Sequence, residues 1–400
     1  MVKFDAFEVE QWMDTYETTP GVLNLAETCA SSISIDELKA LSGEELSLNL
    51  SLPRSSTKLT YGDIRGSSTL RTHIAGLIAG QEGHFPADNV IVTQGAIGAN
   101  FLTFYALVQP GDHVICVYPT YQQLYSVPES LGAEVSLWRL QEENGFVPDV
   151  DELERLVKAN TKMIVINNPN NPTGAIIPAA VLQKIVAFAR ERNIVILSDE
   201  VYRPLFHEGL HGNPDMPPSV ATLGYDKVVV TGSMSKAYAL AGLRLGWVAS
   251  RDRAIVERLA QARDYTTISV SQLDDQVASY ALSPAVVGPL LERNISLARR
   301  NAGILKAFVE RHGSACVWQA NKAGTTAFLQ FRSGGRPVDD VAFCKDVLEK
   351  TKVMLVPGSL CFGKGTDFAG YVRMGYVCET SVLEEGLLKL GAYIEEHLAR

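Results

Sequence analysis

The sequence lacks the features of several protein classes. Its 36 lysines and arginines are outnumbered by 45 aspartates and glutamates, giving a formal charge of −9. With no basic run either, a nucleic-acid surface is not expected. No stretch of about 18 apolar residues occurs, so no membrane contact is expected. The first residues, MVKFDAFEVEQW, carry acids and no apolar signal-peptide core. We therefore expect a cytoplasmic protein.

Cysteine motifs, glycine fingerprints and repeats are also missing. The six cysteines form no C-x-x-C pair, and we expect them to be reduced, with no metal site. The stretch TQGAIGAN at 93–100 does not match the G-x-G-x-x-G fingerprint of dinucleotide-binding proteins. Neither an internal repeat nor a low-complexity linker suggests a third module.

Short apolar runs alternating with helical patterns occupy the middle of the chain. This alternation predicts βαβ crossovers, hence an α/β three-layer fold with a mostly parallel central sheet covered on both faces. The helical patterns lie at 149–160 and 178–193. The β-branched runs, each expected to form a strand, lie at 89–95, 113–119, 162–169, 193–200 and 227–233.

The pattern changes after about residue 285. A long amphipathic stretch at 288–313 precedes strand-like segments and a final helical segment at 381–398. This predicts a smaller α+β lobe formed by 285–400, with 46–284 as the large domain. Residues 1–45 are expected to join the small lobe.

The expected strands end in polar or small residues. Ligands of parallel sheets bind at the carboxyl ends of the strands, so these endings should converge on one crevice. Gly95, Ala96 and Ile97 open a helix whose free N–H groups suit a phosphate, although an ordinary helix-start turn is the alternative. Tyr121 could stack on a flat ring or pack on the rim, and Asn171 could donate its amide to a ring oxygen.

Two of the later strand endings carry charged residues. Asp199 follows the apolar run NIVIL, where an ionised carboxylate is costly unless a cation such as a pyridinium N–H meets it. Tyr202 is close enough to share that ligand. In SMSKAYALAGLRLGW we expect partial desolvation to lower the pKa of Lys236 and make it a nucleophile. Ser233, Ser235 and Arg244 would then hold a phosphate beside it.

A Schiff-base lysine, an aspartate facing a ring nitrogen and a phosphate cup together describe binding of pyridoxal 5'-phosphate (PLP). The chain resembles the class I/II aminotransferase family of fold-type I PLP-dependent enzymes. Eight motifs occur in family order from Tyr61 onward: YGDIRGSSTLR, TQGAIGA, PTYQQL, NNPNNPTG, SDEVY, SMSKAYALAGLRLGW, VPGSLCFG and YVRMGY.

The resemblance implies specific roles. Lys236 would form the Schiff base and move protons, and Asp199 would keep the pyridine nitrogen protonated. Arg373 in YVRMGY would bind the substrate α-carboxylate, a bidentate task for which lysine is a poor substitute. Tyr61 matches a tyrosine that completes the phosphate cup of the neighbouring subunit, which implies a homodimer. The other implied cofactor contacts are Gly95, Ala96, Ile97, Tyr121, Asn171, Tyr202, Ser233, Ser235 and Arg244.

The N-terminal segment departs from the family. Ordinary members carry an N-L-x-x-G-x-P-like stretch, whereas here Thr28 and Ala30 hold the Gly and Pro positions. Such a polar segment resembles capreomycidine synthase-like members, which cyclise a guanidino amino acid; this is a minor alternative to an entry-loop variant at residues 21–36. Glu27 could contact a cationic substrate side chain, or it could cap the helical segment that follows.

The resemblance implies an aminotransferase that moves the amino group of an α-amino acid to a 2-oxo acid. A PLP-dependent lyase or cyclase acting on an amino acid is the alternative, because the cofactor set does not decide which bond breaks. A non-catalytic PLP-binding regulator would need a partner module, and residues 1–45 show no such pattern.

Overall fold

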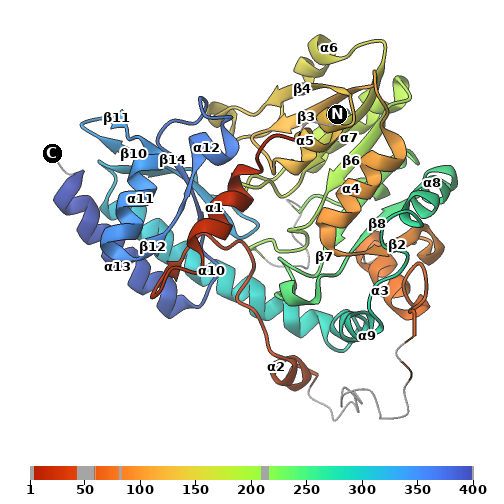
Figure 1. Cartoon of the computed structure of the whole chain (residues 1–400), viewed down its shortest axis with the longest axis horizontal. Coiled ribbons are helices and arrows are strands. Elements are labelled where there is room, and N and C mark those ends of the chain that lie inside the picture. The colour runs from red at the N-terminus through yellow and green to blue at the C-terminus, as the bar shows by residue number, and fades with distance from the viewer. Residues whose placement is uncertain (1–3, 43–57, 59, 81–82, 209–215, 399–400) are drawn as a thin grey trace.

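The computed structural model describes residues 4–42, 58, 60–80, 83–208 and 216–398 (Figure 1). A seven-stranded sheet in the order β2-β8-β7-β6-β5-β3-β4 lies in its larger part. The strands from β7 to β4 pair in parallel, whereas β8 pairs antiparallel with both β2 and β7. This confirms the expected mostly parallel α/β sheet. The strands are β2 (Val90–Thr93), β3 (His113–Tyr118), β4 (Glu134–Arg139), β5 (Thr161–Asn167), β6 (Val195–Asp199), β7 (Val228–Ser233) and β8 (Gly246–Ser250).

Both faces of this sheet are covered, which gives three layers. Along β5, Met163 and Val165 belong to one hydrophobic cluster, while Ile164 and Ile166 belong to another. Because side chains alternate between the faces of a strand, the two clusters lie on opposite sides of the sheet. The helices of this part are α3 (Ser68–Ala79), α4 (Gly95–Leu107), α5 (Gln123–Ser130), α6 (Leu153–Leu156), α7 (Ala179–Glu191), α8 (Arg253–Arg263) and α9 (Gln272–Ala281).

The smaller α+β lobe is built on a five-stranded antiparallel sheet, in which four strands follow the order β11-β10-β14-β13 and β9 pairs with β10. The predicted domain boundary at 45/46 lies outside the described residues, and the boundary at 284/285 stays a prediction. The elements of this lobe are α10 (Val287–Arg311), β9 (Cys316–Trp318), β10 (Thr326–Ser333), β11 (Arg336–Pro337), α11 (Asp340–Thr351), β12 (Val353–Met354), β13 (Val356–Pro357), α12 (Gly358–Phe362), β14 (Tyr371–Gly375) and α13 (Thr380–His397).

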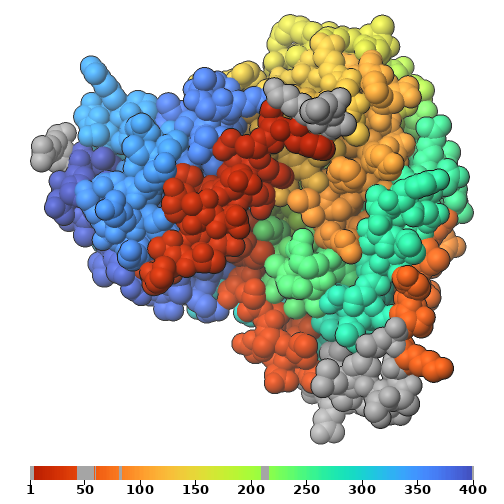
Figure 2. Space-filling model, in the orientation of Figure 1, coloured from red at the N-terminus to blue at the C-terminus, as the bar shows by residue number. Residues whose placement is uncertain are grey.

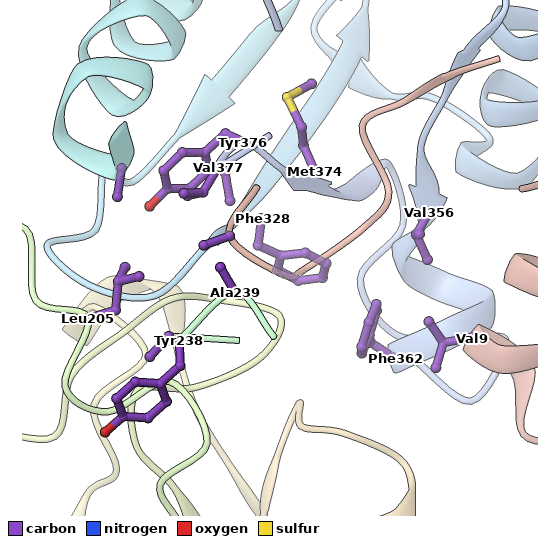
Figure 3. Packing of buried hydrophobic residues seen from close by; sticks show 14 of the residues in the cluster. Val9, Leu205, Tyr238, Ala239, Phe328, Val356, Phe362, Met374, Tyr376 and Val377 are labelled. Atoms are coloured by element: carbon purple, nitrogen blue, oxygen red, sulfur yellow. The ribbon is translucent and has the colours of Figure 1, made fainter. Parts of the chain in front are cut away.

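The N-terminal segment contacts both parts of the molecule. Its strand β1 (Leu23–Asn24) pairs with β12, and Trp12 of α1 (Glu8–Tyr16) donates its Nε1–H to the carbonyl of Leu355 at 2.9 Å. Figure 3 shows Val9 of α1 beside Phe362 and Val356 of the small lobe. The same helix reaches the large domain, where its Glu8 backbone N–H donates to Gln122 Oε1 at 3.0 Å. Figure 2 shows these red residues across the junction of the two parts.

The secondary structure differs from the sequence expectation in three places. The helical pattern at 149–160 forms only a 3-10 turn (Val150–Glu152) and the four residues of α6, because the backbone turns extended at Val157 to lead into β5. Strands β4 and β8 were not expected, since β4 is a partly exposed edge strand and β8 begins with glycine.

Within the described ranges, no helix is long and apolar enough to cross a membrane.

Candidate active site

A cavity of about 540 Å³ lies where strands of the central sheet end and the small lobe begins. It gathers residues from the large domain, from β14 of the small lobe and from the N-terminal segment. Gly95 opens helix α4, which carries three of the lining residues, Ala96, Ile97 and Asn100. Of the residues singled out in the sequence, Glu27, Ala96, Ile97, Tyr121, Asn171, Asp199, Tyr202, Ser233, Ser235, Lys236, Arg244 and Arg373 line the cavity.

Lys236 follows β7 and holds its amine against the N-terminal segment. The Nζ donates to Thr28 Oγ1 at 2.7 Å, to Cys29 Sγ at 3.3 Å and to Glu27 Oε1 at 3.4 Å. Burial alone would lower the pKa of Lys236, but the acidic groups of Cys29 and Glu27 outweigh it and raise this pKa above its usual value. The expectation of a lowered lysine pKa is therefore wrong for the cofactor-free protein.

Glu27 is held by its own loop as well as by the lysine. Its Oε1 accepts from the backbone N–H groups of Thr28 at 2.6 Å and Cys29 at 2.9 Å. Although burial opposes it, the Lys236 ammonium together with these hydrogen bonds lowers the pKa of Glu27 to about 2. The idea that Glu27 caps the next helix is wrong, because Ser34 and Glu37 form the capping box of α2 (Ile35–Ala40).

Asp199 ends β6 as a buried carboxylate that is 3% exposed. Its Oδ2 accepts from Asn100 Nδ2 at 2.9 Å and its Oδ1 from the backbone N–H of Val201 at 3.1 Å. Burial raises its pKa to about 6 against these two hydrogen bonds. None of the described lysines and arginines forms an ion pair with it. A pyridinium N–H would supply the missing positive charge, so this acid fits PLP.

The start of α4 and the loop after β7 form a small polar cradle. Gly95 has a left-handed backbone (φ +70°), and a Cβ on it would lie 3.0 Å from Arg244 Nη2. Ser233 and Ser235 place their hydroxyl oxygens 2.9 Å apart, and Arg244 Nη1 reaches Ser235 Oγ at 3.5 Å. Free helix N–H groups, two hydroxyls and a guanidinium are the donors that a phosphate requires.

Arg373 lies on β14 at the opposite side of the cavity and is 4% exposed. Its Nη1 donates to Asn171 Oδ1 at 3.3 Å and its Nη2 to the carbonyl of Ala26 at 3.0 Å. The Nε of this guanidinium is buried without a hydrogen-bond partner, and no described carboxylate pairs with the side chain. A buried cation with only neutral partners is suited to bind an anionic ligand group.

Two tyrosines complete the lining. Tyr202 is 2% exposed, and its burial raises the pKa of its hydroxyl, so it stays a hydrogen-bond donor at neutral pH. Tyr121 donates its hydroxyl to Glu10 Oε1 at 2.8 Å, and its ring centroid lies 4.9 Å from that of Phe7. The N-terminal helix therefore fixes the tyrosine that was expected to stack on the cofactor.

Tyr61 lies outside the cavity with 78% of its surface exposed. Its backbone is held from α9, because Gln272 Nε2 donates to the carbonyl oxygens of Thr60 at 2.7 Å and Tyr61 at 3.2 Å. An exposed tyrosine on a fixed backbone agrees with a residue used by a neighbouring subunit, and that role stays a prediction.

Sequence reasoning missed two features of this site. The side-chain amide of Asn100 donates to Asp199, and its Oδ1 accepts from the Thr231 hydroxyl at 2.8 Å. The signal in the sequence was a single amide residue inside the apolar helix GAIGANFLTFYAL. The acidic face of α1, including Glu10, also lines the cavity. No local signal could place it there, because its partner Gln122 is more than a hundred residues away.

Comparison with known proteins agrees with this interpretation of the cavity. The model of the family "Aminotransferase class I and II" matches residues 44–390. Capreomycidine synthase of Streptomyces vinaceus is 32% identical over 84% of this chain and 81% of its own length. Aspartate aminotransferase of Thermotoga maritima is 30% identical over 84% of both chains.

A solved structure extends the likeness to almost the whole chain. The PLP-dependent aminotransferase from Streptococcus suis superposes with a TM-score of 0.88 at 38% identity, covering 98% of both chains. A cavity with a lysine, a buried acid and an anion cradle at the expected positions accompanies these matches. The chain therefore belongs to the class I and II aminotransferases, a family of enzymes that use pyridoxal 5'-phosphate.

Proposed function

We propose that this protein transfers the amino group of an α-amino acid to a 2-oxo acid. The observation that carries the proposal is Arg373, a buried guanidinium that has no carboxylate partner among the described residues and lies in the same cavity as Lys236. Its planar fork would bind the α-carboxylate that amino acids and 2-oxo acids share. One site could then receive both substrates in turn.

The cofactor would be held by residues of the large domain. The N–H groups of Gly95, Ala96 and Ile97 with Ser233, Ser235 and Arg244 would bind its phosphate, and Asp199 would meet its ring nitrogen. When bound, PLP supplies an electron sink for the pair released when a bond to the amino acid α-carbon breaks. Tyr202 and Asn171 would donate to its ring oxygen, and Tyr121 would cover the ring.

Lys236 would carry both the covalent attachment and the proton. Its amine lies on the same wall as Thr28 and Glu27, so a proton taken by Nζ from the substrate can be kept there and returned. Tyr202 is a neighbour of the amine whose hydroxyl stays neutral at neutral pH, because burial raises its pKa. The lysine thus works within a polar setting made by two distant parts of the chain.

The cavity favours an amino acid with one carboxylate. Lys236, Arg244 and Arg373 are the basic residues among the described lining residues, and each has a task at the cofactor or the α-carboxylate. None is left for a second carboxylate. We infer that the substrate side chain is neutral or cationic.

An amino-acid panel tests this function. Purified, PLP-loaded protein is incubated with single amino acids, including aspartate, and several 2-oxo acids, and product masses are recorded. We expect amino transfer from a neutral or cationic amino acid and at least about tenfold weaker use of aspartate, which would leave a carboxylate unpaired. Efficient use of aspartate would contradict the side-chain inference, and no amino transfer with any pair would contradict transamination.

A second candidate is cyclisation or elimination, in which the amine is not passed on to a 2-oxo acid. It is favoured by the polar groups at the Lys236 amine, where ordinary members have a Gly-x-Pro segment, and by the similarity to capreomycidine synthase. With amino acid alone, a transaminase leaves the bound cofactor in its amine form after one turnover. A cyclase or lyase returns the cofactor to its lysine-bound form and makes product over many turnovers. The absorbance of the cofactor and the yield of product therefore distinguish the two reactions.

We also propose that the protein is a homodimer in which Tyr61 of one subunit reaches the phosphate cradle of the other. The exposure of Tyr61 supports this arrangement.

A cytoplasmic location is proposed as well, supported by six unpaired cysteines, as expected in a reducing compartment.

A further inference from the structure

The amine of Lys236 lies against three consecutive side chains, which we call the amine seat: Glu27, Thr28 and Cys29. The shortest contact is the 2.7 Å hydrogen bond to Thr28 Oγ1, and the carboxylate of Glu27 approaches to 3.4 Å. Tyr202 is another titratable neighbour of this amine, and because burial raises the pKa of its hydroxyl it is neutral at neutral pH. The seat therefore combines one negative charge with neutral hydrogen-bonding groups.

The seat is fixed by its backbone. Asn24 Oδ1 accepts from the N–H groups of Ala26 and Glu27 at 3.0 Å, which shapes the turn that enters it. Thr325 Oγ1 donates to the carbonyl of Thr28 at 2.6 Å, so the small lobe also holds the seat. Gly375 packs so closely that an added Cβ would lie 1.7 Å from the carbonyl oxygen of Glu27.

The loop is also tied to the lysine it faces. The N–H of Ala30 donates to the carbonyl of Lys236 at 3.3 Å, and the N–H of Ser31 donates to the carbonyl of Val377 at 2.7 Å. The seat therefore keeps its place relative to Lys236 through the main chain, independently of where the amine points. An amine that leaves and returns would meet the same groups each time.

We propose that the amine seat is the resting place of the Lys236 amine whenever it is not joined to the cofactor, and that Glu27 keeps the resting amine protonated. The proposal rests on the proposed attachment of PLP to Lys236. In it Glu27 is a positioning residue that acts through the lysine, and Thr28 fixes the direction of the amine. A proton accepted by Nζ would stay there as ammonium until the lysine turns back.

The physical reason is charge. A carboxylate at 3.4 Å stabilises the ammonium form over the neutral amine, and the hydrogen bonds from the Thr28 and Cys29 backbone keep Glu27 ionised. The pKa of Cys29 is raised to about 11, chiefly by burial, so its thiol is neutral near pH 7 and adds no charge then. Glu27 is thus the group whose removal should change the protonation of the amine.

Labelling of the cofactor-free protein tests this without catalysis. The rate at which trinitrobenzenesulfonate modifies Lys236 is followed against pH by peptide mass spectrometry, because this reagent attacks neutral amines. We expect Glu27→Gln to speed modification at pH 8 by about tenfold, since one lost unit of pKa raises the neutral fraction tenfold. Glu17→Gln is the matched control, because it removes a carboxylate from the same cavity without touching Lys236.

The loaded enzyme gives a second readout. In Glu27→Gln, kcat should fall about tenfold with KM nearly unchanged, because the released amine is no longer kept protonated by the carboxylate. Thr28→Val, which keeps the charge and the shape, should lower kcat without the tenfold change in labelling rate. It also carries the test if thermal melting shows that Glu27→Gln is unfolded.

Unchanged labelling of Lys236 in folded Glu27→Gln would overturn the proposal, as would a Thr28→Val enzyme with full kcat when Glu27→Gln does not fold. Failure of the proposed function is distinguishable from this outcome. If the protein takes up no PLP, the attachment to Lys236 is wrong, whereas labelling of the cofactor-free chain still reports whether Glu27 controls the amine.

Discussion

The cavity floor, which we define as Asn171, Asp199, Ser233, Ser235 and Arg244, differs from the N-terminal wall formed by residues 8–31. Asp199 is 3% exposed and Ser233 2%, and both end strands of the central sheet. In the wall, the Glu27 side chain is 46% exposed and is held by loop hydrogen bonds. The floor is thus set by strand register, whereas the wall is set by contacts between distant parts of the chain.

This difference suggests a division of labour. In the proposed function the floor holds PLP, and it lies within the range 44–390 that matches the family. The wall replaces the usual Gly-x-Pro segment with Thr28, Cys29 and Ala30, and it meets the lysine amine directly. We infer that the floor supplies the common chemistry and that the wall selects substrate and outcome.

The largest effect is expected at the lysine that belongs to both regions. Lys236→Ala should lower turnover by at least about ten-thousandfold and abolish the absorbance band of the lysine-bound cofactor, because covalent attachment and proton transfer are both lost. Lys184→Ala, at an exposed lysine of α7, is the control. A folded Lys236→Ala protein with normal turnover would contradict the proposed role of Lys236.

The next effect concerns the substrate side of the cavity. Arg373→Lys should raise KM for the amino acid by about a hundredfold, because a point charge replaces a bidentate guanidinium. Steady-state kinetics with the best substrate of the panel measures it, with Arg336→Lys on the exposed strand β11 as control. An unchanged KM would mean that the α-carboxylate binds elsewhere.

Asp199→Asn separates stability from function within the floor. Burial raises the native pKa of Asp199 to about 6, so the cofactor-free protein loses stability as pH rises from about 4 to 6. The neutral amide should remove up to about 3 kcal/mol of this cost at pH 7. Denaturant unfolding of both cofactor-free proteins measures the gain, while turnover of the loaded variant should fall. A destabilised Asp199→Asn would show that Asn100 and Val201 already satisfy the carboxylate.

The smallest effect tests the proposed dimer. Tyr61→Phe removes one hydroxyl from an exposed side chain and should weaken PLP retention by about tenfold, the worth of one hydrogen bond to a charged group. Equilibrium dialysis measures retention, and light scattering measures the assembly state. Unchanged retention in a dimer would exclude Tyr61 from the cradle, and a monomer with full activity would exclude the shared site.

The floor could be predicted from sequence because each of its groups follows an apolar run that could be recognised as a strand. Asp199 and Ser233 lie at such ends. The shift of the lysine pKa could not be predicted, because Glu27 lies 209 residues before Lys236 and nothing local shows that they meet. The role of α1 was missed for the same reason: it faces the cavity through contacts with Tyr121 and Gln122.

The most direct test of the central claim is to map the attachment site of the cofactor. The PLP-loaded protein is reduced with borohydride, digested and analysed by mass spectrometry. We predict that the reduced cofactor is found on the peptide that contains Lys236, and that this peptide is unmodified when PLP is left out. Cofactor fixed to another lysine, or none fixed although the protein retains PLP, would contradict the account.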